Sequence, residues 1–233
     1  MTDLETLVNR SLGDPNPPAT LDFGVGVAGS SSRSHLETVN MQAFFLDSDI
    51  AQHCKLTAPP NVDITVPDQI LEALGSGSVI ESFTCSYFKH VNPWMPIISK
   101  SKVLRWIDTI SNTPRPDVAV LLLSMRLLTE SVSETGPAQS ELYHLVKRFR
   151  LSLDIAGQRS LLILQAGLLI TVYEVGQAIF PAAYISIGSC AREGVALGIH
   201  NRNAPQLLGQ PLNWASWEER QRVWWLILIL DRS

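Results

Sequence analysis

Two apolar runs constrain this chain more than any other feature of its sequence. One covers residues 161–172 and contains Gln165, and the other, VWWLILIL, covers residues 223–230. A helix that crosses a bilayer needs about 20 apolar residues, so both runs are too short to do so. In water, an apolar helix of this length has to be covered by other helices. We therefore expect two buried helices and no membrane partner.

Residues 63–233 favour helices throughout. Apolar residues recur every three or four positions, and no long segment alternates between apolar and polar residues as a strand does. The pattern predicts an all-α domain of about eight helices. The expected helices lie within 66–74, 79–92, 99–110, 115–131, 136–155, 159–179 and 180–199, followed by a last one near the chain's end.

Four residues mark expected helix starts. Pro116 and Pro137 suit the first position of a helix, where the missing N–H has no intrahelical partner to lose. Ser216 and Glu219 have the S-x-x-E spacing of a capping box, in which both side chains bond backbone N–H groups of the first turn. The sequence therefore predicts helices that begin at the two prolines and just after Ser216.

The first 62 residues differ in character from this domain. GDPNPPAT, GSSSRS and TAPPNVD are rich in proline, glycine and serine, which interrupt helices and strands alike. Acidic residues outnumber basic ones by seven to three in the first sixty positions. We expect a mostly disordered acidic tail over residues 1–62.

A glycine motif lies in this tail. GVGVAG matches the G-x-G-x-x-G pattern of dinucleotide-binding loops through Gly24, Gly26 and Gly29. Such a loop follows a hydrophobic strand and opens a helix, but here DPNPPATLDF precedes the glycines and SSSRS follows them. A flexible linker explains the motif better than a nucleotide site does, and a nucleotide-binding enzyme stays as an alternative.

Charge and cysteine content argue against two kinds of site. The net charge is −4 and the basic residues form no cluster, so the electrostatic signature of nucleic-acid binding is absent from the sequence. Cys54, Cys85 and Cys190 lie far apart and the five histidines lack ligand spacing, so we expect no metal site. Sparse cysteines, odd in number, indicate a reducing compartment.

No catalytic site emerges from the motifs. The sequence lacks G-x-S-x-G, the turn that presents a nucleophilic serine. Cys190 lies beside Arg192, but helical spacing places it with Ile185 and Val195 on an apolar face, so we expect a buried structural thiol. We predict that the chain is not an enzyme and needs no cofactor.

Charged residues interrupt the last two helices. Two explanations stay open, since these side chains either form a solvated face or pair across helices and fix the packing. The residues concerned are Arg192, Glu193, Glu218, Glu219, Arg220 and Arg222.

Three stretches, in this order, resemble the fungal-specific transcription factor domain, the middle homology region of fungal zinc-cluster transcription factors. YFKHVNPWMPIISKSKVL (87–104) is similar to its N-terminal signature, and residues 161–201, which end in ALGIHN, are similar to its central helix pair. WEERQRVWWLILILDR (217–232) is similar to its helix with a Trp pair and a Leu-Asp-Arg ending. The matching residues are Tyr87, Phe88, Pro96, Arg192, Gly198, His200, Glu219, Arg222, Trp224, Trp225, Asp231 and Arg232.

The resemblance implies a transcription regulator that works in the nucleus, and the habit of the family points to metabolic or secondary-metabolite genes. Family members usually begin with a six-cysteine zinc cluster that binds DNA, whereas this chain has three cysteines. Zinc and DNA contact are therefore expected only through a missing domain or a partner. The implied partners are other proteins or a second copy, with a small molecule as effector. A helical ligand-binding or protein-interaction module without a role in transcription is the alternative.

The last apolar run carries one more expectation. The family's domain continues beyond Arg232, so we expect this chain to be a partial version in which some cover of the last helix is missing. The Trp224–Leu230 surface should then be partly exposed and prone to self-association.

Overall fold

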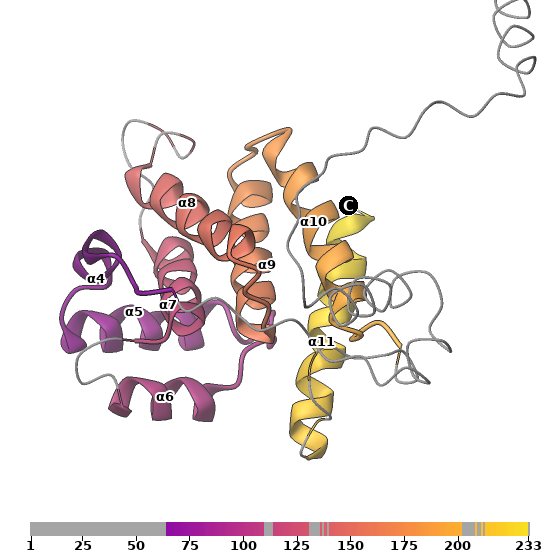
Figure 1. Ribbon diagram of the computed structural model, residues 1–233, viewed down its shortest axis with the longest axis horizontal. Coiled ribbons are helices and arrows are strands. Elements are labelled where there is room, and N and C mark those ends of the chain that lie inside the picture. Colours follow the sequence, from indigo (N-terminus) through magenta and orange to yellow (C-terminus); the bar gives the residue numbers. More distant parts are fainter. Residues whose placement is uncertain are drawn as a thin grey trace, which may run out of the picture. The chain divides into compact units, whose positions relative to one another are not determined.

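The computed structural model describes residues 64–109, 114–130, 140–201 and 213–232, and four single residues between these ranges (136, 138, 208 and 211) (Figure 1). The predicted tail, with its glycine motif, lies outside the described residues, and so does Pro137.

Eight helices and no strand make up the described part of the chain, which confirms the all-α prediction there. The helices are α4 (Asp68–Leu74), α5 (Gly77–His90), α6 (Lys100–Thr109), α7 (Pro116–Thr129), α8 (Glu141–Ile155), α9 (Leu161–Gly176), α10 (Ala182–Ala196) and α11 (Trp214–Asp231).

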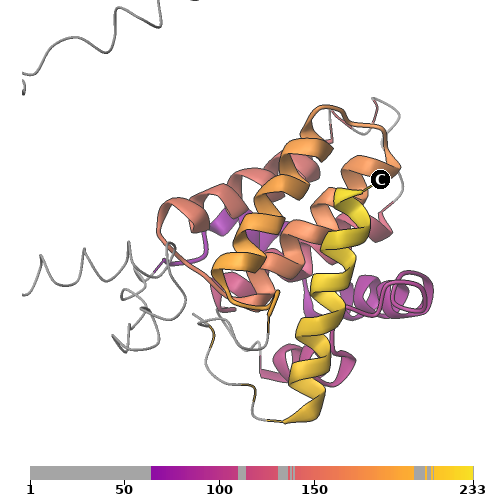
Figure 2. The same cartoon turned by 90° about the vertical axis from the view of Figure 1, so that its right-hand side faces the viewer.

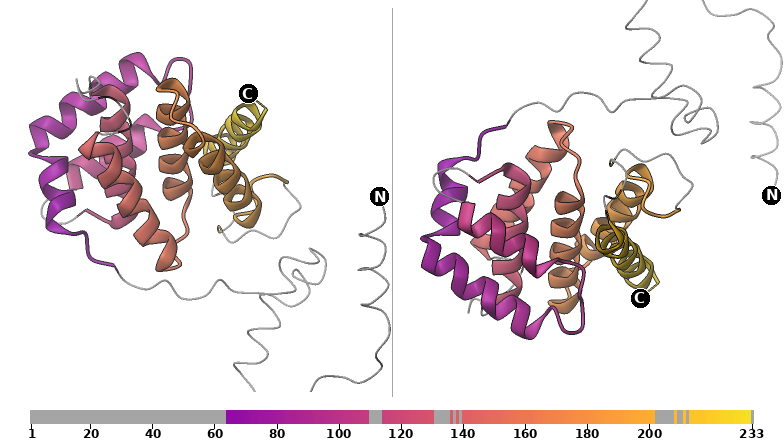
Figure 3. Two further views of the ribbon diagram at one scale, coloured as in Figure 1. Left: turned by 90° about the horizontal axis from the view of Figure 1, so that it is seen from above. Right: turned by 90° about the horizontal axis from the view of Figure 1, so that it is seen from below.

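Helix α9 lies at the centre of this arrangement. It packs against α7, α8, α10 and α11, and α7 in turn packs against α4, α5 and α8. Views from above and below show α4–α8 on one side of α9 and the α10–α11 pair on the other (Figure 3). Because α9 has neighbours on all sides, its residues are apolar all round and the turns from Ile163 to Thr171 are buried. The expectation of a buried helix over residues 161–172 is confirmed.

Of the two helix starts predicted at prolines, one is confirmed and the other is wrong. Helix α7 begins at Pro116, as expected, with the proline in its first turn. Helix α8 does not begin at Pro137, because its first residue is Glu141 and the Ser140 hydroxyl accepts from the backbone N–H of Tyr143 at 3.4 Å. A serine that satisfies an otherwise unbonded N–H competes well with a proline, which only supplies a suitable φ.

The prediction of a capping box at Ser216 and Glu219 is wrong. Helix α11 begins earlier, at Trp214, and the side chain of Asn213 accepts from the backbone N–H of Ser216 at 2.9 Å. Ser216 therefore lies inside the first turn. Glu219 turns into the core, where it pairs with Lys102, instead of back toward the helix start.

Cys190 is buried, as predicted, but the residues expected beside it are not. Ile185 and Val195 are exposed, whereas the inward face of α10 carries Ala183, Ile187, Cys190 and Gly194. Burial raises the pKa of the Cys190 thiol to about 12, which makes it inert. Within the described ranges, no helix combines the length and apolar character that a membrane crossing requires.

Replacing Asn213 by alanine should lower the free energy of unfolding by about 1 kcal/mol, because the acceptor for the Ser216 N–H is lost. Ser216→Ala is the matched control, and we expect it to change stability by less than about 0.5 kcal/mol. Urea unfolding followed by circular dichroism measures both. A larger loss for Ser216→Ala than for Asn213→Ala would restore the capping box.

Candidate functional site

Three glutamates of the described helices lie in the core, and each pairs with a cation from another helix. Glu174 of α9 pairs with Lys147 of α8, Glu193 of α10 with Arg150 of α8, and Glu219 of α11 with Lys102 of α6. These pairs connect α6, α8, α9, α10 and α11. Since a buried charge without a partner is very unfavourable, the pairs fix which helices are neighbours.

Glu219 sits where three segments meet. Its Oε2 lies 2.5 Å from Lys102 Nζ, and its Oε1 accepts from Gln165 Nε2 of α9 at 3.1 Å. The same amide nitrogen also donates to the carbonyl of Ile97, at 2.6 Å. Gln165, a buried polar residue of α9, therefore joins α11 to the segment that precedes α6.

Arg150 reaches Glu193 by crossing over α9 at a glycine. The guanidinium donates to Glu193 and, at 3.0 Å, to Asp154 of its own helix. A Cβ added to Gly167 would lie 2.8 Å from Arg150 Nε, so any side chain there would push the guanidinium away from its present position. Burial raises the pKa of Glu193, although the Arg150 charge opposes that effect.

Glu174 accepts from two side chains of α8. Tyr143 Oη donates to Glu174 Oε1 at 2.6 Å, and Lys147 Nζ donates to the same oxygen at 2.7 Å. Lys147 also donates to the Ser186 hydroxyl of α10 at 2.9 Å. Burial, followed by the neighbouring carboxylate, raises the pKa of Tyr143, so the phenol keeps its proton and remains a donor.

A second glycine sets the approach of α10 to α11. A Cβ on Gly194 would lie 3.0 Å from Ile227 Cδ1 and 3.3 Å from Trp224 Cζ3. Trp224 also faces the ring of His200, with centroids 5.8 Å apart. Gly194 therefore lets Trp224 and Ile227 of α11 pack closely against α10, and His200, just beyond α10, covers the Trp224 ring.

The residues that carry the family resemblance separate into an inward and an outward group. Tyr87 and Phe88 are buried with rings 5.3 Å apart and nearly perpendicular, and Gly198 ends α10 with a φ of 76°. Together with Glu219, and with the partly buried His200 and Trp224, they form the inward group, whereas the half-buried Arg222 pairs with the exposed Glu218. The exposed members are Pro96, Arg192, Trp225, Asp231 and Arg232.

Of the charged residues in the last two helices, some pair across helices and others lie on a solvated face. Glu193 and Glu219 pair across helices, as described above. Arg192 is exposed, and Glu218 pairs with Arg222 within α11 at 2.7 Å. Arg220 is partly buried, and burial lowers its pKa.

Sequence reasoning missed Lys102, Lys147, Arg150 and Glu174. A lysine or arginine on an amphipathic helix gives no sign of which carboxylate it meets, because Lys102 and Glu219 are 117 positions apart. Glu174 did offer a signal, since it is the single charged residue of α9. A lone charge in an apolar helix indicates a buried partner.

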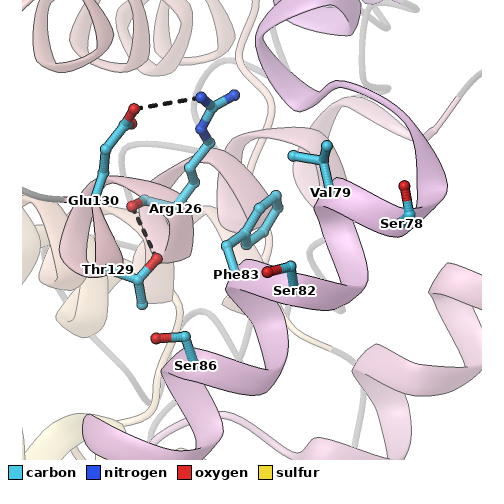
Figure 4. A pocket seen from close by; sticks show the side chains of 8 residues that line it. All are labelled: Ser78, Val79, Ser82, Phe83, Ser86, Arg126, Thr129 and Glu130. Carbon is cyan, nitrogen blue, oxygen red and sulfur yellow. Dashed lines mark hydrogen bonds and ion pairs between the residues drawn. The ribbon is translucent and has the colours of Figure 1, made fainter.

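A shallow groove lies between α5 and α7 (Figure 4). Its volume is about 380 Å³. The Thr129 hydroxyl donates to the Arg126 carbonyl at 3.0 Å, and the Arg126 guanidinium donates to Ala73 O of α4 and to Glu130. The lining residues are Ser78, Val79, Ser82, Phe83, Ser86, Arg126, Thr129 and Glu130.

The outer face of α11 is apolar, as expected from the sequence. Trp225 is 62% exposed and Ile229 is 61% exposed, whereas Ile227 is buried. The prediction that the Trp224–Leu230 surface is partly exposed is confirmed. Among the described residues, no group of three or more histidines, cysteines or carboxylates is placed to hold a metal ion.

Lys102→Met should lower the free energy of unfolding by about 2 kcal/mol or more, because Glu219 would stay buried without its cation. Arg222→Met is the matched control on an exposed pair, and we expect a loss below about 1 kcal/mol. Chemical unfolding of both variants gives the two values. Equal losses would show that the buried Lys102–Glu219 pair contributes no more to stability than the exposed Glu218–Arg222 pair.

Gly167→Ala and Gly188→Ala should change stability in opposite directions. The first pushes Arg150 off its path to Glu193 and should cost about 1–3 kcal/mol. The second adds a methyl group in α10 where nothing lies within 4 Å, and should gain about 0.5–1 kcal/mol from helix propensity. Thermal unfolding of the two variants tests this, and a stabilising Gly167→Ala would refute the crossing.

Comparison with known proteins places these features in a family. The family model of the fungal specific transcription factor domain matches residues 85–233, from α5 to the end of the chain. The chain is 41% identical over 182 residues to transcription factor BOA15 of Botryotinia fuckeliana (strain B05.10), which covers 78% of this chain and 99% of that protein.

A second relative is much longer. The chain is 25% identical over 154 residues to transcription factor tazR of Aspergillus terreus (strain NIH 2624 / FGSC A1156), which is 63% of this chain and 24% of that protein. No solved structure matches the chain. The match from residue 85 onward and the likeness along almost the whole of the first relative lead to one conclusion: the chain belongs to the family of fungal-specific transcription factor domains.

Proposed function

We propose that this transcription regulator acts in the nucleus as a regulatory region that works through protein contacts. The observation that carries the proposal is the family match over residues 85–233, which spans seven of the eight described helices at least in part. The exposed apolar face of α11 supports it, because an apolar surface of this kind is typical of protein interaction sites.

DNA contact is assigned to a partner or to a domain outside these 233 residues. A net charge of −4 without a basic cluster repels the phosphate backbone, and three cysteines are too few for the family's zinc cluster. The chain itself is proposed to need no zinc and to catalyse no reaction. Metabolic or secondary-metabolite genes are the proposed targets, from the habit of the family.

Binding of a small-molecule effector is the second candidate function, and the groove between α5 and α7 favours it. Four hydroxyl-bearing side chains and Arg126 line a space of about 380 Å³, within the range that small ligands occupy. Hydroxyl and guanidinium donors suit an oxygen-rich or anionic molecule. A thermal-shift screen with metabolites tests this, and Ser82→Trp, which fills the groove, should abolish any shift.

The regulatory proposal is tested with the whole chain fused to a heterologous DNA-binding domain in a fungal reporter strain. We expect the fusion to change reporter transcription, Arg222→Met to keep that effect, and Lys102→Met to weaken it because the helical core is disturbed. Fluorescence imaging of the tagged chain should show nuclear accumulation.

A gel-shift assay provides the opposing test. The purified chain should not retard DNA at physiological salt. A specific retarded band formed by the chain alone would overturn the assignment of DNA contact to a partner or another domain.

A further inference from the structure

Helices α8 and α10 carry exposed apolar and basic side chains next to the contacts that join them. The two helices lie on either side of α9 (Figure 1), and they meet over it through the Lys147–Ser186 and Arg150–Glu193 contacts. The exposed residues beside these contacts form what we call the α8–α10 face. Its members are Arg148, Leu151 and Ile155 of α8, and Ile185 and Arg192 of α10.

Three apolar side chains of the α8–α10 face are turned to solvent. Leu151 is 58% exposed, Ile185 is 65% exposed and Ile155 is 80% exposed. Single exposed apolar residues are ordinary on a protein surface, whereas a group of them on neighbouring helices marks a site of interaction. Leu151 and Ile155 are one helical turn apart, so they form a continuous strip along α8. Figure 2 shows the orange α10 on the near side of the helical domain, beside the yellow α11.

The two arginines of the α8–α10 face have no ionic partner among the described residues. Arg148 and Arg192 are both exposed, and neither pairs with a carboxylate there. The nearby Asp154 and Glu193 already pair with a cation. Glu141 lies two turns before Arg148, in the first turn of α8, where a negative charge is favourable to the helix dipole. The face therefore offers two guanidinium groups, whose planar donors suit carboxylates.

We propose that residues 41–50 of this same chain, MQAFFLDSDI, bind to the α8–α10 face. The apolar run AFFL covers the apolar residues of the face, and Asp47 and Asp49 pair with its two arginines. No lysine or arginine lies between Arg33 and Lys55, so the carboxylates of the segment have no cation of their own nearby in the sequence.

The composition of the segment selects it over other occupants of this face. Phe44 and Phe45 are the adjacent aromatic pair of residues 1–63, and two carboxylates follow them within four positions. A buried aromatic anchor next to arginine–carboxylate pairs is the usual centre of a protein interaction site. A nucleic acid fits less well, because two cations are too few to hold a phosphate backbone.

Residues 51–63 tether the segment close to the face. Ile64 and Val66, which follow the tether, pack against the core, and α4 comes next and packs against α8. A tether of this length spans at most about 45 Å, about twice the roughly 22 Å length of α8. Such a short tether gives the segment an effective concentration on the order of millimolar. The chain's own segment therefore occupies the face in preference to a separate protein of the same chemistry.

This contact does not rest on the proposed regulatory role. The family match begins at residue 85, so it does not include the segment. The reporter and gel-shift assays can fail while the contact stands, and the reverse also holds.

Cysteine trapping in the whole chain tests the contact. In a background where serine replaces Cys54 and Cys85, Ser48→Cys in the segment is combined with Ser152→Cys, at an exposed position of α8. Mild oxidation at low protein concentration should join the two within one chain, which gives a faster band on a non-reducing gel. The matched control places the second cysteine at Ser101, exposed on α6, and should react about tenfold more slowly or less.

Charge reversal shows whether the two arginines direct the contact. With the trapping pair in place, Arg148→Glu combined with Arg192→Glu should slow disulfide formation about tenfold or more, because carboxylates then face carboxylates. Adding Asp47→Arg and Asp49→Arg to that variant should restore the rate. Both arginines are exposed, so circular dichroism should show unchanged folding. Added salt, which screens the charges without any substitution, should also slow the reaction.

Four results would each overturn the proposal. They are equal rates for the two positions of the second cysteine, a rate that ignores the arginine substitutions, no recovery when all four charges are reversed, and a disulfide that forms only between chains, with a rate that rises with protein concentration. The last result would mean that the face takes a segment of another molecule.

Discussion

Moving a carboxylate from water into a helical core costs several kcal/mol unless a cation and hydrogen-bond donors go with it. This domain meets that condition three times, at Glu174, Glu193 and Glu219, and each time the cation comes from another helix. Apolar packing alone tolerates many arrangements of helices that are similar in size and shape. We infer that the three pairs select one of them, because any shift of α8 or α11 that parted a pair would leave a buried charge alone.

The pairs in turn explain the glycines of α9 and α10. A guanidinium can cross a helix only where no side chain stands in the way, so the Arg150–Glu193 pair depends on Gly167. The Lys102–Glu219 pair requires α11 to lie close to the centre of the domain, and Gly194 allows that by leaving room for Trp224 and Ile227. Glycine lowers helix propensity at both positions, and the close approach that it permits compensates for this loss.

Helical periodicity was enough to predict most of the fold. It depends on side chains three and four positions apart, and the sequence shows these directly. The buried α9 and the start of α7 at Pro116 followed from such local patterns. The first residues of α8 and α11 did not, because Ser140 and Asn213 were as capable of capping as Pro137 and Ser216 were of starting a helix. The ion pairs could not be predicted from the sequence, for a different reason. A buried glutamate and an exposed one look the same in a sequence until the distant cation that pairs with the buried one is known.

Glu218 and Glu219 show that α11 has one face in the core and another on the surface. They are chemically identical neighbours, yet a turn of about 100° around the helix sends Glu219 to Lys102 and Gln165 and leaves Glu218 exposed, where it pairs with Arg222 of the same helix. Two such steps separate the buried Ile227 from the exposed Trp225. A helix that served packing alone would carry polar residues on its outer face. The exposed face of α11 instead carries Trp225 and Ile229 as well as the charged Glu218 and Arg232. Packing within this domain therefore does not explain why Trp225 and Ile229 are exposed.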